Sequence, residues 1–216
     1  MAGVALLLAA CGGVQVRPEP ALPVPLLQPM QARVGLVLDE ELRTYNHDET
    51  RGGTRWQVDL GPGHEQMFRR VFESSFETLQ VFQTAAAARG AANVQAVFRP
   101  RVEQFSFATD EETGGEYWAV TIRYNIALSA ADGAVIDTLS LTGYGSSRGG
   151  RAANALTRAT HAAMRDAAAK FLVQMPRLPV ARKLAAGEQL TPEDAAVSKA
   201  DVVETVPIEA EPAANP

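Results

Sequence analysis

The stretch WAVTIRYNIAL, residues 118–128, alternates without a break between large apolar side chains and smaller or polar ones. A period of two places successive side chains on opposite faces of a strand, so this pattern predicts a strand with one buried face. Asp132-Gly133, a pair typical of a tight hairpin turn, follows it. Alternation resumes over residues 135–142, and the apolar-rich residues 97–107 precede the stretch. Together these segments predict an antiparallel meander.

Two features interrupt this meander. Pro100 lacks a backbone donor, which predicts an edge strand or a bulge at that point. Glu103-Gln104 breaks the apolar pattern and indicates a bulge nearby. After the last strand, residues 143–150 hold four glycines and are expected to form a flexible crossover.

Two segments show the spacing of amphipathic helices. The first, residues 64–80, carries an apolar stripe. The second covers residues 152–174, and its alanine-rich inner stripe favours close packing on the sheet. The stripe of the first helix consists of Phe68, Val71, Phe72, Ser75, Phe76 and Leu79. Its phenylalanines are expected to form core; the alternative is a ligand pocket around Phe68, Phe72, Phe76 and Trp118.

The N-terminal half supplies the remaining elements. Residues 33–39 form a nearly continuous apolar run, typical of a strand buried on both faces. Residues 40–55 indicate a long loop or a frayed hairpin, and residues 56–60 a short strand. The order β-(β)-α-β-β-β-α predicts an α+β two-layer sandwich. Its mostly antiparallel sheet has four to five strands, with two helices on one face.

Leu8-Ala9-Ala10-Cys11 ends a short apolar run and contains the only cysteine. The run is too short to span a bilayer and suits an export signal. The four residues resemble the bacterial lipobox, although no basic residue precedes the run. The resemblance implies cleavage before Cys11, a thioether diacylglycerol on its sulfur and N-acylation. By the same resemblance, Gly12 favours sorting to the outer membrane.

The chain therefore divides into four expected parts. Residues 1–10 are the signal peptide, and residues 11–32 are the lipidated cysteine with a proline-rich tether. Such a tether would hold the domain up to roughly 60 Å from the lipid. Residues 33–175 form the α+β domain. Residues 176–216 are an acidic, largely disordered tail with a short helix near 192–199.

The order of elements behind a lipobox resembles the small envelope lipoproteins of the YajG and LptE kind. Their domain is similar to the anticodon-binding-like α/β fold seen at the amino end of TolB and in the curli secretion lipoprotein. The similarity covers residues 33–175 and rests on architecture, not on a site motif. It implies a role in the cell envelope and transfers no site residue.

Arg99, Arg101 and Arg123 are the candidate binding residues, because strand periodicity can place them on one face. Such a cationic stripe suits anionic lipid phosphates or a partner. Pairing of the arginines with Glu103, Asp137 or another carboxylate is the open alternative.

Net charge and missing motifs argue against several classes of function. The net charge of −5 over 216 residues argues against nucleic-acid binding. Phosphate-loop, zinc-protease and serine-hydrolase motifs are missing, so we expect no enzyme, no cofactor and no metal. His47-Asp48-Glu49 and Asp110-Glu111-Glu112 are read as solvated loops.

The expected function is that of a non-catalytic lipoprotein at the periplasmic face of the outer membrane. It would be an accessory or assembly subunit, anchored through Cys11 and bound to an envelope protein such as a barrel or a secretion complex. The alternatives are a lipid- or small-ligand-binding periplasmic module and a tethered hydrolase.

Overall fold

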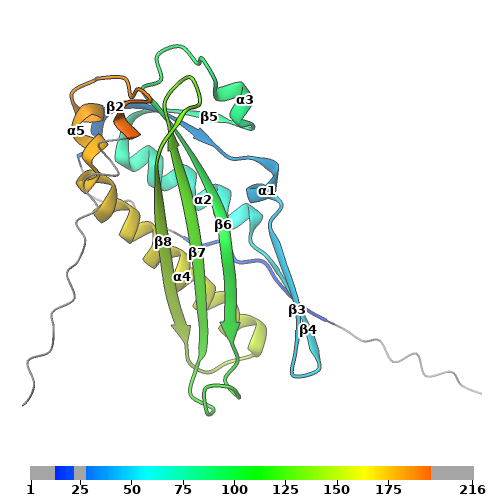
Figure 1. Ribbon diagram of the computed structural model, residues 1–216. Coiled ribbons are helices and arrows are strands. Elements are labelled where there is room, and N and C mark those ends of the chain that lie inside the picture. The colour runs from blue at the N-terminus through cyan, green and yellow to red at the C-terminus, as the bar shows by residue number, and fades with distance from the viewer. Residues whose placement is uncertain (1–12, 22–27, 196–216) are drawn as a thin grey trace, which may run out of the picture.

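The computed structural model describes residues 13–21 and 28–195, which form an α+β structure with two layers. One layer is a five-stranded sheet in the order β5-β2-β6-β7-β8 (Figure 1). The three long strands β6, β7 and β8 are the predicted antiparallel meander. The strand β2 runs parallel to both of its neighbours, so one side of the sheet is parallel. The strands are β2 (Met30–Val37), β5 (Phe76–Phe82), β6 (Ala96–Ala108), β7 (Trp118–Ser129) and β8 (Val135–Ser147).

The second layer contains two long helices on one face of the sheet, as predicted (Figure 1). These are α2 (Gly61–Ser75) and α4 (Ala152–Gln174). The shorter helices are α1 (Glu40–Arg43), α3 (Ala85–Ala88), η1 (Met175–Arg177) and α5 (Pro179–Ala185). None of the helices in the described residues combines the length and the apolar character that crossing a membrane requires.

Aromatic side chains fill the space between the layers. The ring of Phe72 lies 5.1 Å from that of Phe98 and 4.8 Å from that of Phe171, measured between centroids. The four residues of the alternative ligand pocket are all buried to at least 96%. They are Phe68, Phe72, Phe76 and Trp118. These aromatics therefore pack as core, and core packing of this kind leaves little room for a ligand.

A small second sheet lies beside the helices, in the order β1-β4-β3. Its strands are β1 (Val14–Val16), β3 (Asn46–Arg51) and β4 (Thr54–Asp59). The hairpin of β3 and β4 turns at Gly52 and Gly53, whose positive φ angles of 57° and 75° suit glycine. Trp56 joins this sheet to the large one, because its ring lies 5.2 Å from that of Trp118.

The first long helix is shorter than predicted. It ends at Ser75, and Phe76 already has an extended backbone. Residues 76–82 form β5, an edge strand that pairs in parallel with β2. Leu79 fits the helical period, yet the free edge of β2 offers this segment a ladder of backbone hydrogen bonds. Tertiary pairing has therefore outweighed local periodicity.

The meander contains one of the two predicted interruptions, near Glu103, whereas Pro100 lies neither in an edge strand nor at a bulge. The register between β6 and β7 shifts between Val102 and Gln104, so the bulge at Glu103 is confirmed. Pro100 lies in an interior strand, but β2 pairs with β6 only through residues 96–98. Its missing N–H therefore costs no ladder bond on that side.

The predicted flexible crossover at residues 143–150 is mostly strand, since β8 continues to Ser147. A Cβ at Gly143 would overlap the Ala163 carbonyl oxygen and come within 2.9 Å of the Ala167 Cβ. Glycine here lets α4 lie directly on the strand. The glycine-rich sequence serves close packing and not flexibility.

Both predicted appendages are partly docked on the domain. Residues 14–16 pair with β4, Val16 is 4% exposed, and Pro18 and Pro20 are buried. The tether predicted for residues 11–32 is therefore not a free spacer over residues 13–21. At the other end, α5 buries Val180 and Leu184, so the tail is not disordered before residue 186. The signal peptide, Cys11 and residues 196–199 of the helix predicted near 192–199 lie outside the described residues.

Candidate functional site

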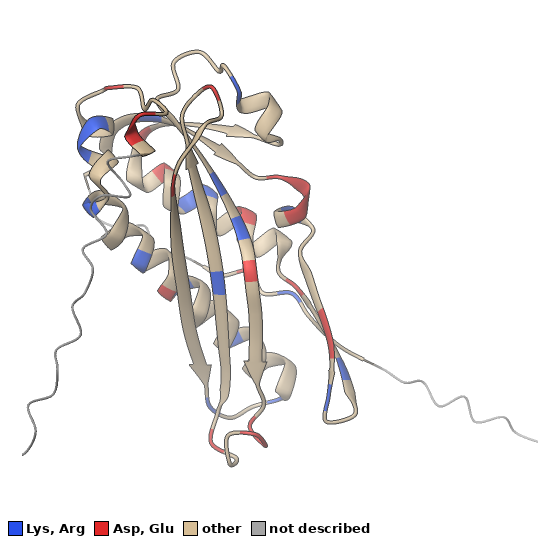
Figure 2. Cartoon of the chain, viewed as in Figure 1, with Lys and Arg blue, Asp and Glu red and all other residues tan. Residues whose placement is uncertain are grey.

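The face of β6, β7 and β8 that points away from α2 and α4 is uncovered except at the end where α3 packs, and we call it the open face (Figure 2). Its side chains are those that alternate with the buried set of the meander, and most are small or polar. The open face carries charged residues on β6 and β7 (Figure 2). It is therefore the surface on which the candidate arginines lie.

The structure brings the three predicted arginines together on the open face. In the β6–β7 register, Arg99 lies opposite Ala127, Arg101 opposite Asn125, and Arg123 opposite Gln104. Alternation along each strand places these arginines on one side of the sheet.

Each of the three arginines pairs with a carboxylate. The Nη2 atom of Arg99 lies 2.6 Å from Asp39 Oδ2. The corresponding separations are 3.6 Å between Arg101 and Glu41, and 3.8 Å between Arg123 and Glu103. The last two pairs are exposed and weak by distance, so solvent and salt screen them. The stripe is therefore charge-balanced and, at Arg101 and Arg123, free to exchange partners.

Arg99 is held more firmly than the others. Asp39 Oδ2 accepts from Arg99 Nε at 2.8 Å, while Oδ1 accepts from the Leu42 backbone N–H at 3.2 Å. The second bond caps the start of α1. Asp39 itself is 8% exposed, so this carboxylate fixes the direction of the guanidinium.

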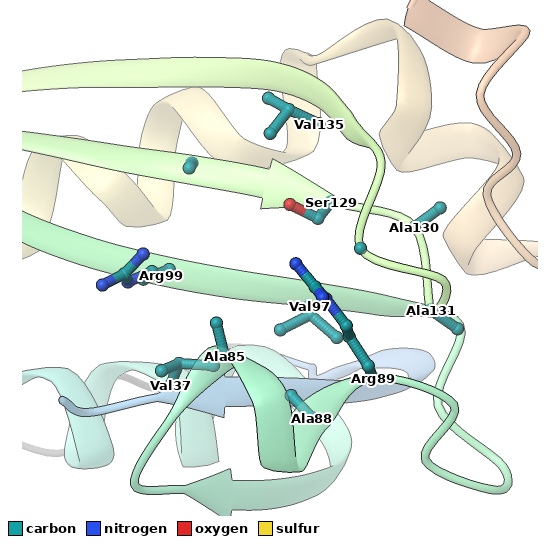
Figure 3. A pocket seen from close by; sticks show the side chains of 12 residues that line it. Val37, Ala85, Ala88, Arg89, Val97, Arg99, Ser129, Ala130, Ala131 and Val135 are labelled. Atoms are coloured by element: carbon teal, nitrogen blue, oxygen red, sulfur yellow. The ribbon is translucent and has the colours of Figure 1, made fainter.

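A cavity of about 240 Å³ lies at the end of the open face, beside the β7–β8 turn (Figure 3). Val37, Val97 and Ala127 give it an apolar floor, and the short helix α3 forms one wall. Arg89 and Arg99 line it together (Figure 3). This volume is below the usual range of about 300–1,000 Å³ for ligand sites, so only a small ligand would fit.

Arg89 gives this cavity a net positive charge. It follows α3, and its backbone N–H bonds to the Ala86 carbonyl, but its guanidinium forms no hydrogen bond or ion pair with any residue in the described ranges. Among the described residues Arg99 has Asp39 alone as its carboxylate partner, so two guanidinium groups share one negative charge. A small anion with an apolar part would complement both the apolar floor and the two guanidinium groups.

Sequence reasoning missed Arg89. The segment from residue 85 to 90 reads as a short helical turn, and an arginine beside a glycine is not distinctive. The cavity forms because parallel pairing of β2 with β5 and β6 brings α3 next to the β7–β8 turn. That pairing has no local sequence signal.

The opposite end of the molecule holds a network of paired charges. Arg51 bonds to Glu49 and, at 2.7 Å, to Glu112, which joins the β3–β4 hairpin to the acidic loop after β6. His47 Nε2 lies 2.7 Å from Glu49 Oε2. A hydrogen bond from the Thr109 backbone lowers the pKa of Glu112 below its usual value. Within the described residues, no group of three or more potential ligands gathers to hold a metal.

A buried polar pair lies in the core. The rings of His64 and Tyr124 are 5.4 Å apart, and both side chains are fully buried. Neither ring nitrogen of His64 nor the hydroxyl of Tyr124 has a hydrogen-bond partner among the described residues. Burial alone lowers the pKa of His64 from 6.5 to about 3, so the imidazole is neutral at physiological pH.

No protein-family model and no curated protein matches the chain. A solved structure from Helicobacter pylori, provisionally named a neuraminyllactose-binding hemagglutinin homolog, has a TM-score of 0.50 at 8% identity. The match covers 84% of this chain and 99% of that one. At this identity the likeness shows a shared fold alone.

Two further solved structures resemble the chain more loosely. Protein XCC0632 of Xanthomonas campestris, of family DUF330, has a TM-score of 0.46 at 14% identity, over 75% of this chain and 91% of that one. A Caulobacter crescentus protein, provisionally named a lipoprotein, has a TM-score of 0.33 at 14% identity. That match covers 42% of this chain and 71% of the other.

Proposed function

We propose that this chain is a non-catalytic, lipid-anchored protein of the bacterial cell envelope, held at the periplasmic face of the outer membrane. The observation that carries the proposal is Leu8-Ala9-Ala10-Cys11, a short apolar run that ends in two small residues and a thiol. Durable anchoring requires more than one acyl chain, which diacylglycerol on the sulfur together with an N-acyl group provides. The nearness of Cys11 to Val14, the first residue of β1, supports a short anchor for the folded body.

The described body supports binding in place of catalysis. Its three histidines are engaged or isolated: His47 contacts Glu49, His64 is buried, and His161 has a buried Nε2 without a partner. None of them hydrogen-bonds a serine or threonine hydroxyl within the described residues, as a nucleophile and its base would. A tethered hydrolase is therefore the least supported alternative.

The open face is the proposed contact surface for an envelope protein, such as a barrel or a secretion complex. The exposed pairs of Arg101 and Arg123 with glutamates can be exchanged for a partner's carboxylates at small cost. A pull-down from detergent-solubilised membranes tests this contact. Reversing the charge of Arg99, Arg101 and Arg123 should abolish capture of a stoichiometric partner, and unchanged capture would exclude the arginine stripe.

A second candidate function is small-ligand binding, which the cavity between Arg89 and Arg99 favours. Its size and chemistry suit a small organic anion, with hexanoate and phenyl phosphate as probes. Titration calorimetry should show binding that Arg89→Gln abolishes. Arg101→Gln is the matched control, because it removes a charge from the same face outside the cavity. Equal loss in both variants would point to general charge attraction.

The anchor has its own test. Replacing Cys11 with serine removes the acyl-accepting sulfur and leaves every described residue unchanged. On expression in a Gram-negative host, the parent should sediment with outer-membrane vesicles in a density gradient. The Cys11→Ser variant should leave that fraction, whereas unchanged sedimentation would contradict lipid anchoring.

A further inference from the structure

We infer that the anchor holds the Trp56–Trp118 end of the domain against the bilayer and presents the Arg89 cavity at the opposite end, to the aqueous compartment. The inference rests on acylation of Cys11, put forward above. It narrows the ligand class, because an anion that reaches this cavity comes from solution and not from the leaflet that holds the anchor.

The chain between the sulfur of Cys11 and the folded body is short. Cys11 and Val14 are three residues apart. An extended chain spans at most about 3.6 Å per residue, so the two Cα atoms lie within about 11 Å of each other. The proline-rich segment cannot extend this distance, since it follows β1 and does not precede it.

The segment that follows Cys11 is attached to the domain through β1. Val14 lies opposite Trp56 in the parallel pairing of β1 with β4, and Val16 lies opposite Val58. Val16 is 4% exposed, and the residues after it pack on the start of α2, where the Pro18 carbonyl closely approaches Gly63. Releasing β1 would expose this surface to water, so the attachment point is part of the fold.

The cavity lies far from the Trp56–Trp118 end of the domain. The rings of Trp56 and Trp118 lie 5.2 Å apart, and Trp118 is the first residue of β7. The last residue of β7 is Ser129, which lines the cavity. A strand of this length rises about 3.4 Å per residue and spans about 37 Å. The β7–β8 turn and α3 accordingly lie at the far end of the sheet from the loop after β6 (Figure 1).

The anchored end carries paired charges on its surface, which suit contact with lipid headgroups and disfavour entry into the hydrocarbon. Arg51 pairs with Glu112, and Arg55 pairs with Asp48. Among the described residues, the large apolar side chains that are exposed are Val135, Tyr144 and Val173. Val135 lines the cavity, at the opposite end, whereas Tyr144 lies opposite Thr121, three residues from Trp118.

Energy transfer on vesicles tests the placement. Residues 11–216 keep every described residue, and Cys11 is their only cysteine. The protein is coupled through Cys11 to maleimide-headgroup lipid in vesicles of phosphatidylcholine and phosphatidylglycerol. Transfer is then measured from its two tryptophans, Trp56 and Trp118, to dansyl headgroups. A control inserts about 30 glycine and serine residues between Gly12 and Gly13, which moves the body about 30 Å away on average.

We expect efficient transfer in the parent and transfer at least about threefold lower in the control with the inserted linker. A second variant moves the donor to the far end by combining Trp56→Phe, Trp118→Phe and Val135→Trp. Its transfer should also be low. The comparison of parent with linker control changes no core residue, so it decides the anchoring distance even if the second variant does not fold.

Two results would overturn the inference. Parent transfer no higher than that of the linker control would show that β1 does not hold the domain near the lipid. Equal transfer from Val135→Trp and the parent would show that the body lies flat. Because coupling to the vesicle is chemical, these results do not depend on acylation in the cell. Loss of the proposed function and loss of this orientation are therefore distinguishable.

Discussion

Acidification should destabilise the fold through His64. The folded-state pKa is lowered from 6.5 to about 3 by burial, so the unfolded chain binds a proton that the folded chain refuses. This stability is fully present above pH 6.5 and is lost as the pH falls towards 3. Each pH unit in that window costs about 1.4 kcal/mol, so the loss between pH 6.5 and about pH 4.5 is about 3 kcal/mol.

Urea unfolding followed by circular dichroism at several pH values measures this loss. Carboxylates with lowered pKa values, such as Glu49 and Asp194, also lose stability in acid, so the wild-type slope alone is not specific. The control is His64→Leu, which keeps the site apolar and removes the titrating group. Wild type should lose about 3 kcal/mol more than this variant over the same window. Parallel curves for the two proteins would refute the reasoning.

Two further predictions concern packing and capping. Gly143→Ala should destabilise by about 3 kcal/mol, because its methyl group would overlap the Ala163 carbonyl; the melting temperature of a domain this size should fall by about 6–12 °C. Ser146→Ala on the same strand is the control, and equal melting temperatures would contradict a backbone-to-backbone contact. Asp39→Ala should cost about 1–2 kcal/mol in urea unfolding, because it removes the cap of α1 and the partner of Arg99. A loss below about 0.5 kcal/mol would show that the cap contributes little.

The meander was predictable from local pattern, and the reason is geometric. Alternation at residues 118–128 and the Asp132-Gly133 turn leave little choice of register, since a shift by one residue would expose the entire apolar set. The bulge at Glu103 could be located for the same reason, because it breaks the alternation. The α+β class and the two covering helices followed from these strands and from the helical stripes.

The elements that sequence reasoning missed all depend on contacts between distant segments. Residues 76–82 form a strand only because β2 offers a parallel edge. Residues 14–16 form a strand only because β4 lies beside them, although the prolines after them suggest a spacer. Gly143 reads as flexibility until the position of α4 is known.

In the candidate site, too, some features follow from local sequence pattern and others depend on contacts between distant segments. The placement of Arg99, Arg101 and Arg123 on one face follows from strand periodicity, and their role as a contact surface stays a prediction. Arg89 enters the site only through the topology that brings α3 to the β7–β8 turn. The docked N-terminal segment changes the physical picture most, because it replaces a long proline-rich tether with a short attachment at one end of the sheet.

The central claim is that acyl chains on Cys11 hold this short attachment at the membrane. Mass spectrometry of the N-terminal peptide, from protein purified out of membranes, tests it most directly. The account predicts a peptide that begins at Cys11 and carries the added mass of a diacylglycerol thioether and an N-acyl group. A peptide that still contains residues 1–10, with an unmodified thiol at Cys11, would contradict it.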